Sequence, residues 1–222
     1  MALIVYGGSL SPFVRKIRVM LTEKDVPYQL DQVNPFAPPP AFLEISPLKR
    51  IPVLRDTDLP EPNTLPDSSI IADYIEHKHP NPPLYPREAF ARAQALWFEE
   101  YADTVLAAAV GPGVFFERVV RKMMRGQCDE TVVAATIRDK LPKIFDYLDR
   151  EVGSKTYVVG SAFSIADIAI ATHFVNFAHA GETVDTKRWP ELARYTQGIL
   201  ARPSFKAMID EERPIAERFR AA

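Results

Sequence analysis

Two serines near the start of the chain stand where a hydroxyl group could stabilise an anion. Ser9 and Ser11 follow the apolar run Leu3–Tyr6 and precede a segment with helical spacing that begins at Pro12. A hydroxyl between a strand end and a helix N-terminus lies beside free N–H groups and the positive end of the helix dipole. A thiolate there would gain about 1.5–3 kcal/mol, which lowers a thiol pKa by roughly one to two units. The alternative is that Ser11 only caps the helix.

The segment Arg50-Ile51-Pro52-Val53 is a second candidate binding element. A proline that follows an aliphatic residue at the start of a strand is a candidate for a cis peptide bond. In that geometry the backbone of Ile51 offers its N–H and its C=O to an extended peptide ligand, as in strand addition. The alternative is an ordinary trans proline.

A third candidate is Asp67-Ser68, which precedes another helical pattern. The Ser68 hydroxyl and the N–H groups of a helix start can hold a carboxylate, and the Asp67 carboxylate can accept from an ammonium group. The alternative is simple N-capping. Three such sites at one sheet edge could bind the amino-acid end, the thiol and the terminal carboxylate of a small thiol peptide in turn.

The elements that would position these residues lie in the first 80 residues. Four short segments predict strands, and the last of them must be an edge strand because it contains a proline: Leu3–Tyr6, Tyr28–Val33, Ile51–Leu54 and Thr64–Pro66. Helices are expected after Ser11-Pro12 and after Asp67-Ser68, and a proline-rich loop over 34–40. The order is β-α-β followed by β-β-α.

The rest of the chain shows helical patterns and no convincing strand. One stripe ends at Gly111-Pro112-Gly113, and its Trp97 is expected in the core beside Phe90; its members are Phe90, Ala93, Trp97, Tyr101 and Val105. A second stripe over 137–152 contains Pro142, which predicts a kink or a later start. Ser164 and Asp167 have the spacing of a capping box, and Pro190 and Pro203 are placed to open helices.

Composition excludes several classes of protein. The 222 residues carry a formal net charge of -2, so no polyanionic partner is indicated and nucleic-acid binding is not supported. One cysteine, Cys128, allows no internal disulfide, which fits a reducing compartment. The four histidines lack metal-ligand spacing, so no metal is expected. No apolar run is long enough to span a membrane, and the start does not resemble a signal peptide.

A basic cluster formed by Arg118, Arg121, Lys122 and Arg125 is compatible with two interpretations. It is either the solvated face of a helix or a patch that attracts an anionic substrate.

Taken together, these motifs resemble the soluble glutathione transferases of the serine type. The resemblance rests on the segments Ser11-Pro-Phe-Val-Arg-Lys16, Ser46-Pro-Leu-Lys-Arg-Ile-Pro-Val-Leu54, Leu65-Pro-Asp-Ser-Ser-Ile-Ile-Ala-Asp-Tyr74, Gly160-Ser-Ala-Phe-Ser-Ile-Ala-Asp167 and Arg202-Pro-Ser-Phe205. They span nearly the whole chain in the family's order. The chain departs from the pattern before Ile51, where the family often has glycine followed by lysine and this chain has Lys49-Arg50.

The resemblance implies a thioredoxin-like α/β domain over 1–79, a linker over 80–87 and an all-helical domain over 88–222, usually in a cytoplasmic homodimer. It places Ser11 at the catalytic hydroxyl position, with Ser9 as runner-up and Tyr6 less favoured because it should lie within a strand. The implied glutathione-binding residues are Ser11, Phe13, Arg50, Ile51, Pro52, Asp67, Ser68 and, from the neighbouring subunit, Asp103. A pocket for the second substrate would include Tyr101, Phe115 and Phe116.

The expected function is detoxifying transfer of glutathione to a small hydrophobic electrophile. Glutathione-dependent isomerisation or peroxide reduction would use the same thiolate, although Pro12 stands where an isomerase of the maleyl type would have a second serine or cysteine. A binding or scaffolding protein that retains the fold without catalysis is the alternative from a different class.

Overall fold

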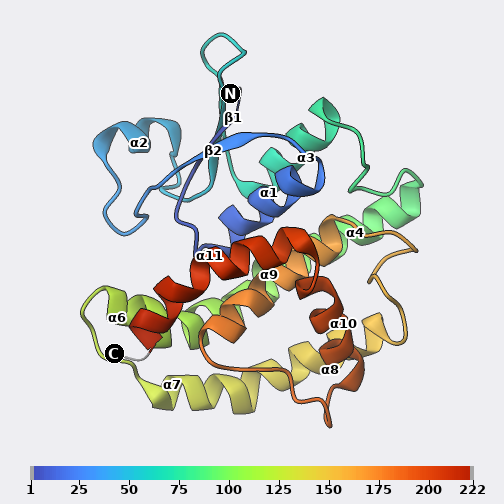
Figure 1. Cartoon of the computed structure of the whole chain (residues 1–222). Coiled ribbons are helices and arrows are strands. Elements are labelled where there is room, and N and C mark those ends of the chain that lie inside the picture. The colour runs from blue at the N-terminus through green and yellow to red at the C-terminus, as the bar shows by residue number, and fades with distance from the viewer. Residues whose placement is uncertain (1–2, 221–222) are drawn as a thin grey trace. The chain divides into compact units, whose positions relative to one another are not determined.

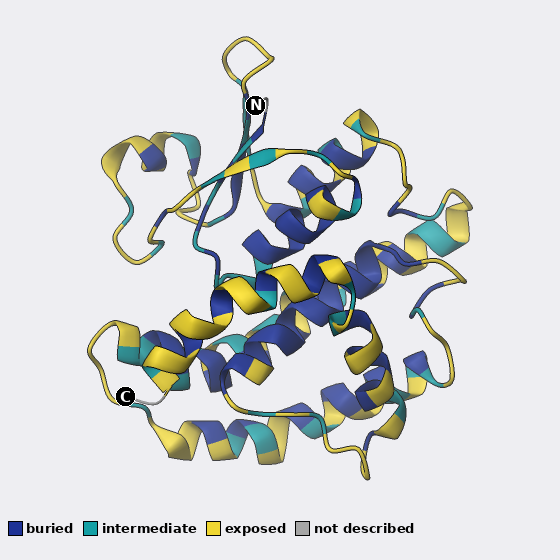
Figure 2. Cartoon of the chain, viewed as in Figure 1, coloured by how far each residue is buried: buried dark blue, intermediate teal, exposed yellow. Residues whose placement is uncertain are grey.

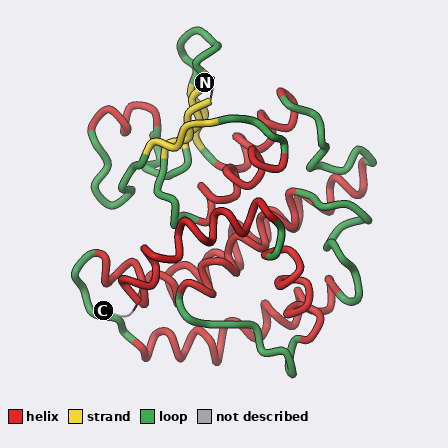
Figure 3. Tube along the Cα trace, viewed as in Figure 1, coloured by secondary structure: helices red, strands yellow, loops and turns green. Residues whose placement is uncertain are grey.

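A computed structural model describes residues 3–220 of the chain (Figure 1). The chain divides between Tyr85 and Pro86 into two compact units. We refer to the first as unit 1 and to the second as unit 2. Unit 1 contains a small sheet with helices, and within the described residues unit 2 consists of helices and loops (Figure 3).

The sheet of unit 1 has four strands in the order β2-β1-β3-β4: β1 (Leu3–Tyr6), β2 (Tyr28–Asp31), β3 (Val53–Asp56) and β4 (Thr64–Pro66). Strands β1 and β2 are parallel, whereas β3 is antiparallel to both of its neighbours, β1 and β4. All four predicted strands are confirmed, and the proline-containing β4 lies at the edge as expected. Strand β2 ends at Asp31 and β3 begins at Val53, each two residues inside the predicted bounds.

Two helices of unit 1, α1 (Pro12–Glu23) and α3 (Ser68–Lys78), lie side by side against the sheet (Figure 1). The buried side chains of Val5 and Leu54 are cross-strand partners and share one face of the sheet. On the opposite face, Tyr6 and Val53 pack with Phe42 of a short helix, α2 (Pro40–Ile45). The sequence pattern did not predict α2, because its apolar residues are too few to establish a period.

A buried ion pair fixes the end of unit 1. The ammonium group of Lys24 lies 2.8 Å from the Glu76 carboxylate and donates to the carbonyl groups of His79 and Pro82, each at 2.8 Å. Glu76 also accepts from the N–H groups of Leu84 and Tyr85. The segment 79–85 is therefore held against unit 1 by charge-assisted hydrogen bonds.

A second polar cluster joins α3 to the sheet. The carboxylate of Asp56, at the end of β3, accepts hydrogen bonds from the Tyr74 hydroxyl and the Lys78 ammonium group. Asp56 is buried, so the two donors replace the water that its carboxylate would otherwise bind.

Unit 2 begins with a long helix that runs from Ala89 to Met123 with two π-helical segments. It comprises α4 (Ala89–Tyr101), η1 (Ala102–Leu106), α5 (Ala107–Val110), η2 (Gly111–Val120) and α6 (Arg121–Met123). The expected end at Gly111-Pro112-Gly113 is wrong. The helix continues because η2 begins at Gly111. Pro112 has no N–H to donate, and the wider π-helical turn accommodates this gap in the backbone hydrogen bonds.

The remaining helices are α7 (Glu130–Ala135), η3 (Thr136–Lys140), α8 (Leu141–Val152), α9 (Ile165–His179), α10 (Pro190–Leu200) and α11 (Pro203–Arg220). Of these, α9, α10 and α11 begin where the sequence predicted a start, whereas α7 and the π-helical form of η3 were not predicted. Pro142 lies in the first turn of α8, directly after η3, and helical structure runs through it without interruption from Glu130 to Val152, so the expectation of a later helix start is wrong. Pro190 and Pro203 open α10 and α11 as predicted.

Helix α9 is the centre of unit 2 and is buried along nearly its whole length (Figure 2). The capping box between Ser164 and Asp167 starts it, as predicted. The buried Asp167 carboxylate also accepts from the N–H of Val158 at 2.9 Å and from the hydroxyl of Tyr195 at 2.7 Å. Asp167 therefore ties the loop before α9 and helix α10 to the same helix start.

The expectation that Trp97 lies in the core is wrong. Trp97 is 54% exposed and Phe90 is 71% exposed. Helix α4 carries a second apolar stripe with the same spacing, formed by Ala95, Phe98, Ala102 and, beyond them, Leu106, and these residues are buried where the helix meets α9. Ala95 and Ala102 allow close approach of the helices, so this stripe occupies the core in place of the stripe that contains Phe90 and Trp97.

Helices also approach closely where η2 meets η3. A Cβ atom at Gly113 would lie 2.5 Å from Oγ1 and 2.7 Å from Cγ2 of Thr136, which is itself buried. Glycine is therefore required by the spacing of the two helices. With this unit helical throughout its described elements, the predicted class, an α/β domain followed by an all-α domain, is confirmed.

Candidate functional site

The strand register brings the three predicted motifs to one end of the sheet of unit 1. Tyr6 pairs with Val53, and Val53 pairs with Pro66. The serine segment follows Tyr6, the Ile51-Pro52 segment precedes Val53, and Asp67 follows Pro66, so all three leave the same end. Neighbouring strands are about 4.8 Å apart, which places the outer two about 10 Å from each other. An extended tripeptide spans roughly the same distance.

Gly7 packs the first two motifs together. A Cβ atom there would lie 2.4 Å from Cγ2 of Val14 and 3.3 Å from Cβ of Ile51. The end of β1 therefore touches both α1 and the segment that enters β3, and a larger residue would push them apart.

Ser11 is the N-cap of α1 and remains partly exposed. Its Oγ accepts a hydrogen bond from the Val14 N–H at 3.4 Å. A hydroxyl has two acceptor lone pairs and one donor proton, so capping leaves the proton available to a ligand. The two alternatives that the sequence left open, capping and anion binding, are therefore compatible. Ser9 is only 6% exposed and is less accessible. Tyr6 lies in β1, as expected, and packs against the Phe42 cluster.

The Ile51-Pro52 bond is cis, which decides between the two geometries that the sequence left open. The Ile51 side chain packs against the cluster around Val53, while the preceding Arg50 is exposed. Phe13 follows in the first turn of α1 and is partly buried.

Asp67 caps α3 with one carboxylate oxygen. Its Oδ1 accepts from the N–H groups of Ser69 at 2.9 Å and Ile70 at 3.4 Å. Its backbone has a φ of 78°, a region that non-glycine residues rarely adopt and that is frequent at binding sites. Asp67 is exposed, whereas Ser68 is only 5% exposed.

A side chain that the sequence pattern did not single out connects the two helix starts. Lys16 is fully buried, and its Nζ donates to Oγ of Ser69 at 3.2 Å. This hydrogen bond joins α1 to the first turn of α3. A lysine in a helix is usually a surface residue, so the sequence carries no signal for this role.

The site residues expected after the linker lie in unit 2. Asp103 is in η1, with its Oδ1 4.0 Å from Nε2 of the buried His173. The ring of Tyr101 packs on that of Tyr147 at 4.7 Å between centroids. Phe115 is buried in the core of unit 2, and Phe116 is partly exposed. Their roles toward a ligand stay predictions.

A cavity of about 190 Å³ lies between α9, α10 and α11 in unit 2. It is lined mainly by aliphatic side chains with charged groups of α11 and by His179. None of the predicted site residues lines it.

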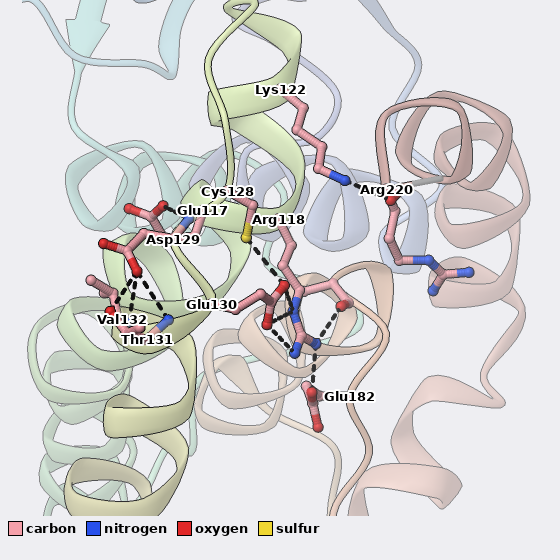
Figure 4. Close-up of polar contacts among 11 residues, drawn as sticks. Glu117, Arg118, Lys122, Cys128, Asp129, Glu130, Thr131, Val132, Glu182 and Arg220 are labelled. Carbon is pink, nitrogen blue, oxygen red and sulfur yellow. Dashed lines mark hydrogen bonds and ion pairs between the residues drawn. The ribbon is translucent and has the colours of Figure 1, made fainter. Parts of the chain in front are cut away.

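The basic cluster of unit 2 takes part in internal ion pairs (Figure 4). Arg118 pairs with Glu130 at 2.9 Å and with Glu182 at 2.5 Å, and Arg121 pairs with Glu117 at 2.6 Å. These contacts join η2 to the start of α7 and to the loop after α9. They give two members of the cluster a structural role.

Cys128 belongs to the same network, and its Sγ lies 3.2 Å from Oε1 of Glu130. Burial and then the hydrogen bond to Glu130 raise the pKa of this thiol to about 11. The thiol is therefore protonated near neutral pH.

Two further features are absent from residues 3–220. In this part of the chain, no three His, Cys, Asp or Glu side chains are grouped as metal ligands. None of its helices combines the length and apolar character needed to cross a membrane.

Comparison with known proteins places this geometry in a family. Residues 5–83 match the family profile for the N-terminal domain of glutathione S-transferases, and residues 130–198 match that for the C-terminal domain. The stringent starvation protein A homolog of Coxiella burnetii is 26% identical over 93% of this chain and 91% of its own length. Glutathione S-transferase F13 of Arabidopsis thaliana is 27% identical over 92% of this chain and 94% of its own length.

Among solved structures, a glutathione S-transferase from Methylobacterium radiotolerans in complex with glutathione sulfonate is 30% identical to this chain. The match covers 94% of this chain and 95% of that one, with a TM-score of 0.75. The domain matches, the relatives and the shared fold agree, and the chain belongs to the glutathione S-transferase family.

Proposed function

We propose that this chain is a glutathione transferase that binds glutathione along the end of its sheet and activates the thiol with the Ser11 hydroxyl. The observation that carries the proposal is the register Tyr6–Val53–Pro66, which gathers three peptide-binding motifs within the length of one tripeptide. The family includes proteins solved with glutathione-like ligands, such as the Methylobacterium enzyme with glutathione sulfonate.

Each part of glutathione has a proposed partner. The Ile51 backbone, ahead of Pro52, pairs with the cysteinyl residue, and Asp67 and Ser68 hold the γ-glutamyl end. The capping geometry supports this assignment, because the cap uses only Oδ1 of Asp67 and leaves the other oxygen for an ammonium group. Arg50, which is exposed, meets the glycine carboxylate.

Three further assignments concern residues beside the peptide site. Phe13 flanks the thiol. In a homodimer, Asp103 of the partner subunit approaches the γ-glutamyl amine. Tyr101, Phe115 and Phe116 form the pocket for a small hydrophobic electrophile.

The proposed reaction is conjugation. The cysteinyl thiol of glutathione loses its proton, and the thiolate sulfur donates an electron pair to an electrophilic carbon. A carbon–sulfur bond forms, and a leaving group departs with its bonding pair or a conjugated double bond accepts the electrons. The protein supplies a lowered thiol pKa and a fixed orientation, both of which raise the rate.

Calorimetric titration with glutathione and with S-hexylglutathione tests the proposal in the wild type and in Ser11→Ala. We expect both ligands to bind, the hexyl form more tightly. Ionisation of the bound thiol, followed by thiolate absorbance, should move up by about one to two pKa units in Ser11→Ala. Ser9→Ala is the matched control and should leave that pKa unchanged. An unchanged pKa in Ser11→Ala would remove Ser11 from the activating role.

A binding role without catalysis is the second candidate, because the Coxiella relative has a name that does not describe an enzyme. It predicts that glutathione does not bind at millimolar concentration. Glutathione-dependent isomerisation and peroxide reduction share the thiolate with conjugation. A panel of electrophiles, maleyl-type isomers and organic peroxides separates the three activities.

A further inference from the structure

The turn before Ile51 has a backbone conformation that its sequence does not favour. Lys49 has a φ of 55°, in the left-handed region that glycine adopts most readily. The Lys49 N–H donates to the Ser46 carbonyl at 2.9 Å, which closes the turn. A lysine at this position needs support from its surroundings to remain in that conformation.

The Ser46 side chain supplies this support from inside the protein. Its hydroxyl donates to the Arg50 carbonyl at 2.7 Å and accepts from the Arg50 N–H at 3.0 Å. One hydroxyl thereby holds both polar groups of the Arg50 backbone. Ser46 is only 1% exposed, and its own N–H donates to the Phe42 carbonyl at 3.0 Å. The turn is therefore anchored to α2.

The residue held in this way is next to the proposed cysteine-binding backbone of Ile51. Arg50 itself is exposed, so its side chain is free to extend from a fixed backbone. The position of a flexible side chain toward a ligand is best defined when its backbone is rigid.

We propose that Ser46 is a positioning residue for the glycine end of glutathione: it fixes the Arg50 backbone and replaces the glycine that the turn would otherwise require at position 49. This inference rests on the proposed function, because it takes Arg50 as the partner of the glycine carboxylate. Ser46 itself touches no ligand.

The test compares two ligands that differ only at the glycine end. Glutathione and γ-glutamylcysteine, which lacks the glycine residue, are titrated into the full-length wild type and Ser46→Ala. Loss of the hydroxyl should weaken glutathione binding by about tenfold and leave γ-glutamylcysteine within about twofold. A role in folding alone would not change the preference between the two ligands.

Two further variants identify the route of the effect. Lys49→Gly, made in the Ser46→Ala background, should restore the preference for glutathione, because glycine holds the turn without the hydroxyl. In an Arg50→Ala background, Ser46→Ala should no longer change the preference. If Ser46→Ala does not fold, the Ser46→Ala/Lys49→Gly protein carries the test and must show the wild-type preference.

The outcomes separate the two proposals. Absence of glutathione binding to the wild type overturns the proposed function, and the inference with it. Binding to the wild type with an unchanged ligand preference in Ser46→Ala, equal weakening of both ligands, or no recovery with Lys49→Gly overturns the role of Ser46 and leaves the proposed function intact.

Discussion

Replacement of Gly113 by alanine should destabilise unit 2, and a second substitution should reverse the sign of the effect. The new Cβ atom would lie 2.5 Å and 2.7 Å from the two terminal atoms of the Thr136 side chain. Overpacking of this kind costs about 1–3 kcal/mol. Alanine gains about 0.5–1 kcal/mol over glycine in a helix. The net expectation is a loss of up to about 2.5 kcal/mol.

Thr136→Ala removes both terminal atoms and leaves its Cβ 3.1 Å from the new methyl group, which small helix shifts can relieve. In this background Gly113→Ala should be neutral or should stabilise by up to about 1 kcal/mol, because the higher helix propensity of alanine over glycine is then the main remaining effect. The coupling free energy between the two positions should therefore be at least about 1 kcal/mol.

Urea unfolding monitored by tryptophan fluorescence is the assay. The chain has two tryptophans, Trp97 and Trp189, and both lie in unit 2, so the signal reports on that unit. The urea midpoints of the wild type, Gly113→Ala, Thr136→Ala and the double variant are compared, provided that the dependence of the unfolding free energy on urea has the same slope in all four. Equal cost of Gly113→Ala in both backgrounds would refute the reasoning, since the clash with Thr136 would then not set the helix spacing.

Three other predictions concern titratable side chains. Burial raises the pKa of Asp56, but its hydrogen bonds outweigh that effect and hold the pKa below the ordinary 3.8, so its stabilisation of unit 1 is lost as the pH falls through the folded pKa. Asp56→Asn should flatten the acid dependence of hydrogen exchange in β3, corrected for the intrinsic rate; an equally steep dependence contradicts this. Cys128 should react slowly with a disulfide reagent at neutral pH, and Glu130→Gln should accelerate the reaction, whereas an unchanged rate would assign the raised pKa to burial alone. Asp167→Ala leaves four buried donor groups without their acceptor and should cost about 3 kcal/mol or more in the same urea assay, and a loss below about 1 kcal/mol would contradict the network.

The sequence predicted the helix starts that depend on a cap or a proline within a few residues. A proline after a capping serine marks the start of α1, prolines open α10 and α11, and the Ser164-to-Asp167 spacing identified the capping box of α9. The succession of strands and helices along the first unit was predicted as well. These features depend on residues within a few positions of one another.

Features that depend on distant partners were not predictable in this way. Helix α4 has two apolar stripes of equal period, and only packing against α9 decides that Phe98 is buried and Trp97 is exposed. The interaction of Lys16 with Ser69 joins residues 53 positions apart, and nothing in the helix pattern distinguishes this lysine from a surface one. The π-helical turn at Pro112 likewise reflects the tertiary setting of a sequence that otherwise indicates a break.

The buried ion pair of Lys24 and Glu76 determines where this chain could be recombined with a relative. A chimaera that exchanged the helical unit at the proline-rich segment 80–83 would separate the buried pair from the Leu84 and Tyr85 N–H groups that complete it. A junction after Tyr85 would transfer the helical unit and keep that set of partners together. For protein engineers, the natural crossover point is therefore the Tyr85–Pro86 bond, several residues beyond the prolines that first suggest one.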